Sequence, residues 1–157
     1  MKIILLAVGK TTEKHFAEGL KDYTSRLSHY ADFRIEVVPD LRNTKNLTQE
    51  QQKEEEGKLI LRQIQPGDDL ILLDERGREM RSVEFAAWLQ TRINRAPRRI
   101  VFLVGGPYGF SPSVRAQAKE SLSLSQMTFS HQMIRLLFAE QLYRAFTILH
   151  NQPYHHE

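Results

Sequence analysis

The sequence predicts one α/β domain with a mainly parallel sheet of five to six strands flanked by helices. Three observations support this class. Short apolar runs alternate along the chain with longer segments of helical periodicity, which is the pattern of repeated strand and helix units. The chain has 157 residues, enough to bury one core. No linker, repeat or low-complexity stretch divides it, so residues 1–157 are expected to form a single domain.

The first third of the chain is expected to form two strands with a helix between them. Residues 3–8 are apolar throughout and end at Gly9, as a short buried strand does. Apolar side chains then recur at helical spacing between residues 16 and 27, which indicates a helix with one core face. Residues 33–38 alternate between polar and apolar side chains and stop at Pro39, so they form a second strand with one partly solvated face.

The next helix is expected to begin after Thr48, because Thr48 and Gln51 have the spacing of a capping box. Its first half, up to Glu56, consists almost wholly of charged and amide side chains. Such a run is typical of a solvated face. We therefore expect this helix to project outward at its start and to pack only through the apolar residues between 59 and 64.

Two strands in the middle of the chain lead into loops that contain glycine. Residues 70–73 form the third strand and are followed by the charged loop 74–78. A helix capped by Ser82 comes next, and residues 99–104 then form the fourth strand and lead into the loop 105–109. Open α/β sheets bind ligands at the carboxyl ends of their strands, and glycine lets a ligand approach the backbone closely. These two loops therefore predict a ligand site.

The chain ends in a helix over residues 130–149 that is apolar nearly all round. Before it, Ser111 and Pro112 are typical of a helix start. Leu122 and Leu124 alternate with serines and indicate a fifth strand. One sheet covers only one face of a helix, so a second apolar face calls for another subunit. We therefore expect a homodimer built on the last helix.

Composition and charge limit the class of protein. Cysteine is absent, which excludes disulfides and thiolate metal sites. The apolar run near the N-terminus, residues 3–8, is too short for a signal peptide or a membrane span, so we expect a cytoplasmic protein without a membrane partner. The formal net charge is +3 and the pI is near 9.3, which permits a nucleic-acid partner without requiring one.

Five features of the last third of the chain occur together. They are the glycine loop Leu103–Phe110, the alternating segment Leu122–Phe129, His131, the helical stretch Ala139–Ala145 and the tail Pro153–His155. Together they resemble the RlmH family of large-subunit ribosomal RNA methyltransferases, which belongs to the SPOUT superfamily. The resemblance extends over the full length of the chain.

This resemblance implies a SPOUT-type α/β domain with a trefoil knot in its C-terminal part, assembled as a homodimer. It also implies an enzyme that uses S-adenosyl-L-methionine to methylate N3 of a pseudouridine in 23S ribosomal RNA. The partner would be this RNA, in the large subunit or in the assembled ribosome. No metal is expected.

The resemblance also assigns site residues in this sequence. The methyl donor would be bound by Leu73, Gly105, Leu124, Ser125, Gln126, Met127, Thr128 and Phe129. His155 would be the catalytic base, with Tyr154 as an orienting group or a platform on which the RNA base stacks. The candidates for RNA contact are Arg76, Arg78, Arg135, Arg144 and His156.

Two positions depart from the family pattern. Ser130 stands where proline is common, and serine is itself a good N-cap, so the start of the last helix should persist. His156 stands where arginine or lysine is usual. Histidine is mostly uncharged at neutral pH, which weakens the case for a phosphate contact at this position.

Two interpretations from other classes remain open. His150, His155, His156 and Glu157 lie close together in the sequence and would offer metal ligands, although they lack the rigid spacing of known metal motifs. Alternatively, the chain is an RNA-binding module without catalysis.

Overall fold

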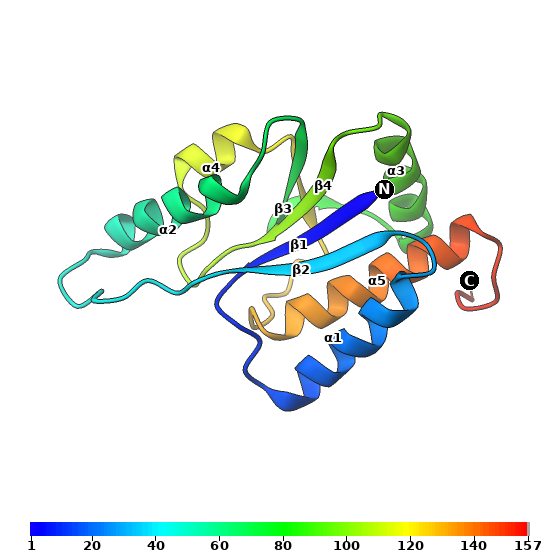
Figure 1. The fold of residues 1–157 in the computed structure, drawn as a ribbon, viewed down its shortest axis with the longest axis horizontal. Helices are drawn as coiled ribbons and strands as arrows, with labels where there is room; N and C mark the ends of the chain where they lie inside the picture. The colour runs from blue at the N-terminus through cyan, green and yellow to red at the C-terminus, as the bar shows by residue number, and fades with distance from the viewer. Residues whose placement is uncertain (157) are drawn as a thin grey trace.

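Five parallel strands form one sheet in the computed structural model, which describes residues 1–156 (Figure 1). Their order across the sheet is β2-β1-β4-β3-β5. The strands are β1 (Lys2–Val8), β2 (Asp32–Val38), β3 (Asp68–Glu79), β4 (Arg99–Val104) and β5 (Glu120–Ser123). The predicted class is confirmed. Because β4 lies between β1 and β3, the loop that follows it starts near the middle of the sheet edge.

Helices cover both faces of the sheet. α1 (Lys14–Leu27), α3 (Ser82–Asn94) and α5 (Met133–Leu149) lie on one face, and α2 (Gln49–Gln63) and α4 (Pro112–Gln117) lie on the other (Figure 1). Within residues 1–156, no helix combines the length and the apolar character that crossing a membrane requires.

The side chains of β1 divide between two apolar cores. Ile3 and Leu5 belong to the core under α1, α3 and α5, whereas Ile4 and Leu6 belong to the core under α2 and α4. A strand buried on both faces has to be apolar at consecutive positions, and this explains the uninterrupted run that predicted β1.

The predicted start of α2 is confirmed by both hydrogen bonds of the capping box. Thr48 Oγ1 accepts a bond from the Gln51 N–H (3.1 Å), and Gln51 Oε1 accepts one from the Thr48 N–H (2.8 Å). The start of α4 is also as predicted, because Ser111 is its N-cap and Pro112 its first residue.

The N-cap of α3 lies one residue before the position that the sequence predicts. Its N-cap is Arg81, and Ser82 is the first helical residue. The Ser82 hydroxyl instead donates to Gln141 Oε1 of α5 (2.8 Å). The Ser82 side chain therefore makes a tertiary hydrogen bond to α5 in place of the predicted capping bond.

β3 is longer than predicted, because it continues alongside β5 to Glu79. The register of this pairing shifts between Leu73 and Arg78, which marks a bulge. At Gly77 a Cβ would come within 2.6 Å of the Ser121 carbonyl carbon. The close approach of two backbones therefore accounts for the glycine in this charged stretch.

β5 is shorter than predicted, and Leu124 lies outside it. Ser123 Oγ donates to the Ser125 carbonyl oxygen (2.8 Å), and Ser125 Oγ accepts a bond from the Met127 N–H (3.0 Å). Side-chain bonds of this kind compete with strand pairing. The segment 124–129 therefore leaves the sheet as a loop at its carboxyl edge.

α5 packs between α1 and α3, so its apolar surface is partly covered within the chain. A Cβ on Gly19 of α1 would lie 2.8 Å from Leu136 Cδ1 of α5, which shows how closely the two helices approach. α5 begins at Met133, later than predicted, and its N-cap is Gln132 and not Ser130, although Ser130 Oγ accepts a bond from the Met133 N–H (3.1 Å). The trefoil knot stays a prediction.

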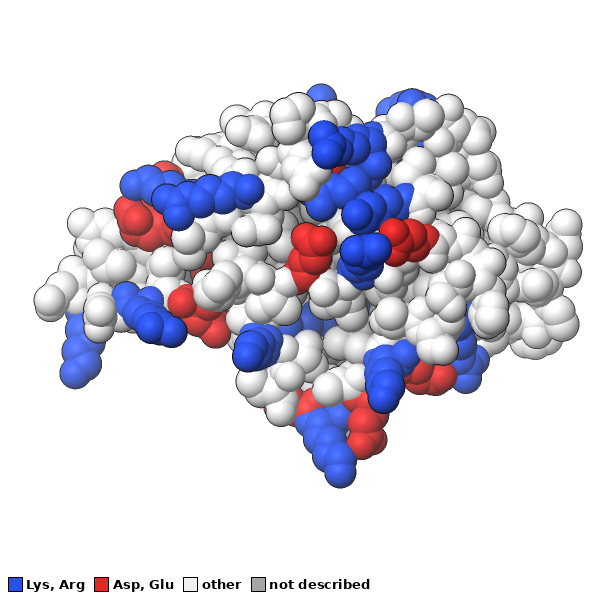
Figure 2. Space-filling model, viewed as in Figure 1, with Lys and Arg blue, Asp and Glu red and all other residues white. Residues whose placement is uncertain are grey.

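Lysine and arginine side chains gather beside the N-terminus, over the amino ends of the strands (Figure 2). Acidic side chains lie among them, and Arg34 pairs with Asp32 while Arg99 pairs with Asp68. Ligand sites of such sheets lie at the opposite, carboxyl edge. This mixed basic region is therefore separate from the loops that predict the ligand site.

Candidate functional site

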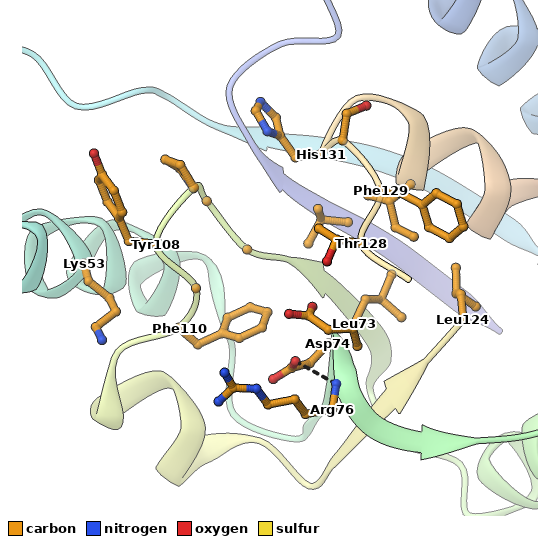
Figure 3. Close-up of a pocket in the computed structure, with 18 of the residues that line it drawn as sticks. Lys53, Leu73, Asp74, Arg76, Tyr108, Phe110, Leu124, Thr128, Phe129 and His131 are labelled. Atoms are coloured by element: carbon orange, nitrogen blue, oxygen red, sulfur yellow. Dashed lines mark hydrogen bonds between the residues drawn. The ribbon is translucent and has the colours of Figure 1, made fainter. Parts of the chain in front are cut away.

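A cavity of about 740 Å³ opens at the carboxyl ends of β3 and β4 (Figure 3). Its walls come from residues 73–76 at the end of the buried part of β3, from residues 104–110 after β4, and from the segment between β5 and α5. Cavities of this size are typical of sites for small molecules. The two loops that predict a ligand site thus meet at one cavity.

All but one of the predicted donor-binding residues line this cavity. Those that do are Leu73, Gly105, Leu124, Ser125, Met127, Thr128 and Phe129. Gln126 is exposed and is not part of the lining. The fold therefore brings together residues from three distant parts of the chain, while their binding of a donor stays a prediction.

The position of Gly105 follows from the register of the sheet. Leu73 pairs with Val104, so β3 and β4 reach the cavity at the same level and Gly105 comes next. A Cβ on Gly105 would lie 3.0 Å from the ring of Phe110, which is buried under the loop. The left-handed glycine of this loop is Gly109, with φ of 82°. Limited space is therefore what favours glycine at position 105.

Asp74 places a fixed carboxylate in the cavity wall. Its oxygens accept hydrogen bonds from the Arg76 N–H (3.1 Å) and from Arg115 Nη2 of α4 (2.8 Å). Burial by itself would raise the pKa of this carboxyl, but the bonds from Arg76 and Arg115 outweigh burial and hold the pKa below its usual value. Asp74 is therefore ionised at neutral pH and can accept bonds from hydroxyl or ammonium groups of a ligand.

Neither Asp74 nor Arg115 is among the site residues that the sequence predicts. The position of Asp74 directly after a buried strand is a signal that would have identified it. Arg115 gives no such signal, because only the fold brings α4 beside the end of β3.

The start of α2 is exposed at residues 49–51, as expected, but α2 also borders the cavity before residue 59, which corrects the expectation that it packs only through residues 59–64. Gln49, Glu50 and Lys53 are lining residues. The Lys53 side chain is only 19% exposed, and its Nζ lies 3.1 Å from Glu50 Oε1. In Figure 3, Lys53 and Tyr108 lie on one side of the cavity and His131 on the other. The polar face of α2 therefore forms part of the cavity wall, with Lys53 mostly buried and Glu50 exposed.

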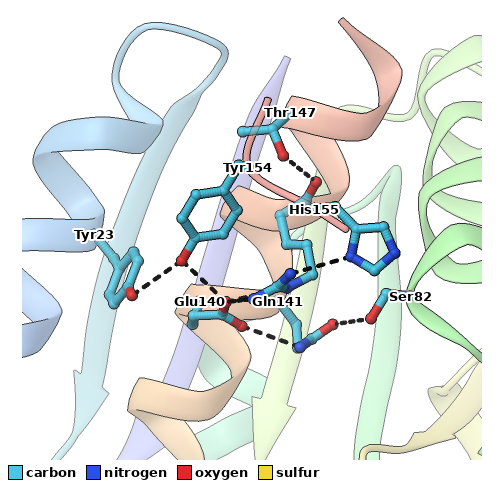
Figure 4. A network of polar contacts seen from close by, with 8 residues as sticks. Tyr23, Ser82, Glu140, Gln141, Thr147, Tyr154 and His155 are labelled. Atoms are coloured by element: carbon cyan, nitrogen blue, oxygen red, sulfur yellow. Dashed lines mark hydrogen bonds and ion pairs between the residues drawn. The ribbon is translucent and has the colours of Figure 1, made fainter. Parts of the chain in front are cut away.

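Tyr154 and His155 do not line this cavity; they form a second cluster with side chains of α1 and α5 (Figure 4). Tyr154 Oη donates to Glu140 Oε1 (3.1 Å) and lies 3.3 Å from Tyr23 Oη. Arg144 Nη1 lies 3.1 Å from His155 Nδ1, and Arg144 Nε donates to Glu140 Oε1 (3.1 Å). The tail is thus held against its own subunit.

The contacts of this cluster keep the Tyr154 phenol neutral and select one tautomer of a neutral His155 ring. Burial, together with the neighbouring Tyr23 hydroxyl and Glu140 carboxylate, raises the pKa of Tyr154 well above its usual value, so its phenol stays neutral. A guanidinium only donates, so Nδ1 of His155 accepts from Arg144 and the proton of the neutral ring lies on Nε2. In this arrangement Nε2 of the neutral ring carries a proton and no lone pair, and the atom is buried.

The predicted RNA contacts divide by exposure. Arg76, Arg78 and His156 are exposed, and Arg76 also lines the cavity. The Arg78 side chain is 61% exposed, with Nη1 3.5 Å from Glu120 Oε1. Arg144 is partly buried and engaged with the tail. Arg76 and Arg78 are therefore accessible to a ligand, and RNA contact at these positions stays a prediction.

Arg135 is fully buried, which corrects its prediction as an RNA contact. Its guanidinium donates to the carbonyl oxygens of Val8 (3.0 Å), Gly9 (2.8 Å) and His131 (2.9 Å), and to Thr11 Oγ1 (3.1 Å). Burial lowers the pKa of Arg135. Its side chain joins the end of β1 to the start of α5 and is not available to a phosphate.

The part of the chain that the structure describes brings no three histidine, aspartate or glutamate side chains together as a metal site. His150 Nδ1 lies 2.9 Å from the Phe146 carbonyl oxygen, and His155 is engaged by Arg144. Glu157, the last of the four residues considered as metal ligands, lies outside the described residues.

Comparison with known proteins matches nearly the whole chain to one family. The family described as "Predicted SPOUT methyltransferase" matches residues 1–155. The chain is 58% identical over 157 residues to "Ribosomal RNA large subunit methyltransferase H" of Phocaeicola vulgatus, and 57% identical to the protein of the same name from Parabacteroides distasonis. It is 54% identical to that of Flavobacterium psychrophilum. Each alignment covers 100% of both chains.

Proposed function

The chain belongs to the SPOUT methyltransferase family, and from this premise we propose that it methylates ribosomal RNA of the large subunit. The proposed reaction transfers a methyl group from S-adenosyl-L-methionine to N3 of a pseudouridine in 23S ribosomal RNA, in the cytoplasm where ribosomes work. The observation that carries this proposal is 58% identity, along the complete chain, to a protein named for methylation of large-subunit ribosomal RNA.

The chemistry of the cavity walls suits the proposed donor. Leu124, Met127 and Phe129 offer apolar surface to an adenine ring. The Gly105 backbone is open to close approach, and Asp74 can accept bonds from ribose hydroxyls or from the ammonium group of the methionine part. These residues lie on separate segments, so one extended ligand can contact all of them.

The main catalytic contribution of the protein is to align N3 of the pseudouridine with the methyl group of the donor. When bound, the donor supplies a methyl carbon attached to a positively charged sulfur. N3 of the pseudouridine has to lose its proton and face that carbon, so holding the RNA base in place lowers the barrier. A positioned base that accepts the proton adds to this effect.

A homodimer would complete this site. Tyr154 and His155 do not line the cavity of their own subunit, so we propose that the tail of one subunit serves the cavity of its partner. Several apolar side chains of α5 remain only partly buried within the chain, which supports a partner on this surface. They are Leu136, Leu137, Tyr143, Ile148 and Leu149.

The contact with Arg144 limits what His155 can do. For His155 to accept the N3 proton at Nδ1, this contact has to open, because the guanidinium occupies the lone pair. With the contact closed, Nε2 is buried within its own subunit, so the tail has to shift before Nε2–H can donate to a carbonyl oxygen beside N3 and orient the RNA base. We propose that orientation comes first and that opening of the contact precedes proton transfer.

Transfer of a radioactive methyl group from S-adenosyl-L-methionine to ribosomes that lack the modification tests the function. We expect incorporation into one pseudouridine of 23S ribosomal RNA, located by mass spectrometry of nuclease fragments. Gly105→Ala is the matched control. It should lose donor binding because there is little space for a Cβ at position 105, and it should stay folded because Gly105 does not have a left-handed backbone conformation. RNA binding without donor binding would favour the module without catalysis.

A further inference from the structure

Glu56 of α2 lies directly behind the diglycine loop of the candidate site. The Gly106 backbone N–H donates a hydrogen bond to its carboxylate. A Cβ on Gly106 would lie 2.3 Å from Glu56 Oε1 and 2.4 Å from Oε2. Such distances leave no space for a side chain, so glycine at position 106 is required by the carboxylate that packs on it.

The next residue of α2 contacts the far end of the same loop. Gly57 is buried, and a Cβ there would lie 2.4 Å from Ser111 Oγ. Ser111 is 1% exposed and caps α4 by accepting a bond from the Val114 N–H (3.3 Å). Two consecutive residues of one helix therefore hold the loop at both of its ends.

The geometry of the peptide bond gives this contact a direction. The Gly106 N–H and the Gly105 carbonyl belong to one planar peptide, and in a trans peptide they point in opposite directions. Glu56 takes the N–H and does not line the cavity, whereas Gly105 and Gly106 do. With the N–H directed at Glu56, the Gly105 carbonyl oxygen is directed away from Glu56, at a peptide that borders the cavity.

We propose that Glu56 is a positioning residue for the methyl donor: it fixes the Gly105–Gly106 peptide so that the Gly105 carbonyl accepts a hydrogen bond from the donor. The matching group on the ligand is an N–H or O–H, such as the adenine amino group or a ribose hydroxyl. This inference rests on the proposed function, since it assigns a residue to donor binding. Nothing in the sequence motifs marks Glu56 for this role.

A negative charge at this place strengthens the effect. Hydrogen bonds polarise one another when they are connected, so an anion on the N–H side makes the carbonyl of the same peptide a better acceptor. Burial raises the pKa of Glu56, the bond from Gly106 opposes this, and the charge of Asp40 after β2 raises the pKa further. Protonation of Glu56 should therefore weaken donor binding as the pH falls.

Calorimetric titration with S-adenosyl-L-methionine tests the assignment in three variants. Glu56→Ala removes the acceptor and should weaken binding about tenfold or more, since hydrogen bonds to charged groups are the stronger ones. Glu56→Gln keeps an oxygen for the Gly106 N–H but not the charge, and should recover part of this loss. Glu55→Ala is the matched control, because Glu55 is exposed and pairs with Lys58 at the surface (2.9 Å). Wild-type affinity in Glu56→Ala would overturn the proposal.

The pH dependence separates positioning from packing. His131 lines the same cavity and Lys53 lies one turn before Glu56, so other charges could also affect donor affinity. Donor affinity is therefore compared between the wild type and Glu56→Gln from pH 5 to 8, the range in which histidine also titrates. Affinity should fall toward acid in the wild type and stay flatter in the variant. Parallel profiles in the two proteins would count against the proposal.

A spectroscopic measurement without donor keeps this inference distinct from the proposed function. In ¹⁵N-labelled protein, the Gly106 amide resonance should move with pH in the wild type as Glu56 titrates, and should lose this movement in Glu56→Gln. If the wild type failed to bind S-adenosyl-L-methionine, the proposed function would fail together with the role in donor binding. If it bound the donor but the Gly106 resonance did not respond to pH, only the role of Glu56 would fail.

Discussion

Arg135 shows how a single buried cation can hold two distant elements together. Replacement of Arg135 by methionine would leave the carbonyl oxygens of Val8, Gly9 and His131 without this donor. Each buried acceptor left unsatisfied lowers the free energy of unfolding by about 1–3 kcal/mol. Part of this loss is offset because the substitution also removes a buried charge. We expect the free energy of unfolding to fall by roughly 3 kcal/mol in urea titrations at a fixed protein concentration.

The control for this variant is Arg78→Met, because the Arg78 side chain is 61% exposed. A surface substitution of this kind should change stability by about 0.5 kcal/mol at most. Equal losses in the two variants would contradict the structural role of Arg135.

Glu56 predicts an unusual dependence of stability on pH. Its pKa in the folded protein lies above the ordinary value of 4.5, so the folded state binds this proton more tightly than the unfolded chain. Its contribution to stability is therefore fully present below pH 4.5 and is lost as the pH rises through the folded pKa. Glu56→Gln should melt at a higher temperature than the wild type at pH 7, and the two curves should converge toward acid.

The matched variant for this experiment is Glu55→Gln on the same helix. Glu55 is exposed, so its replacement should leave the shape of the stability curve unchanged. A wild-type curve that rises from pH 4.5 to 7 by the same amount as that of Glu56→Gln would refute the assigned direction of the shift.

Removal of the C-terminal tail, the segment after α5, is expected to separate donor binding from methyl transfer. Truncation after Gln152 removes Tyr154 and His155, which contact side chains of α1 and α5 but not the cavity. Donor affinity should stay close to that of the wild type while methyl transfer is lost. His155→Ala alone should lower the rate about a hundredfold or more if His155 is the base.

The pH–rate profile distinguishes the two roles of His155. A base should produce an acidic limb in the range where histidine titrates, and this limb should disappear in His155→Ala. A residue that only orients the RNA base should cause a smaller loss with no change in the limb. Full activity of the truncated protein would remove the tail from the mechanism altogether.

Local sequence predicts an element well when neighbours in the chain determine it. The capping box of Thr48 and Gln51 and the start of α4 at Ser111 are examples, because each partner lies within a few residues. The length of β3 was not predictable in this way, since its extension depends on pairing with β5. The same reason applies to Glu56 and Arg135, whose charges become buried only through contacts with distant parts of the chain.

Of the eight residues that the family resemblance assigns to the donor, seven line one cavity and Gln126 does not, while donor binding at these residues stays a prediction. Local sequence patterns did not single out Asp74, Arg115 or the polar face of α2 as parts of the site. Hydrophobic periodicity reports which side of a helix meets an apolar core. It carries no signal for a polar face that packs against a loop, which is how Glu56 and Lys53 are used.

At the level of the whole assembly, the proposed dimer can be tested by mixing two inactive variants. Gly105→Ala keeps an intact tail, and truncation after Gln152 keeps an intact cavity. If the tail acts on the partner, each mixed dimer has one complete site. Random exchange in a twofold dimer should then restore about a quarter of the wild-type activity. No recovery after subunit exchange, confirmed by mass spectrometry, would show that tail and cavity act within one subunit.

The size and charge of the molecule predict its preferred substrate. A net charge of +3 with Arg76 and Arg78 beside the cavity provides few phosphate contacts, so recognition has to rely on the shape of a large particle. We expect much faster methylation of assembled ribosomal particles than of a short hairpin that contains the target. Equal values of kcat/KM on the two substrates would refute this.

The bond from Arg135 to the Val8 carbonyl also bears on how the protein is made. The two residues are 127 positions apart in a chain of 157, so the first strand is synthesised long before its last partner exists. The central helix of one core, α5, likewise follows all five strands in the sequence. Contacts of such long sequence separation slow folding. The core that contains α5 therefore cannot close until α5 has been synthesised, and until then the apolar side chains of β1 lack this cover.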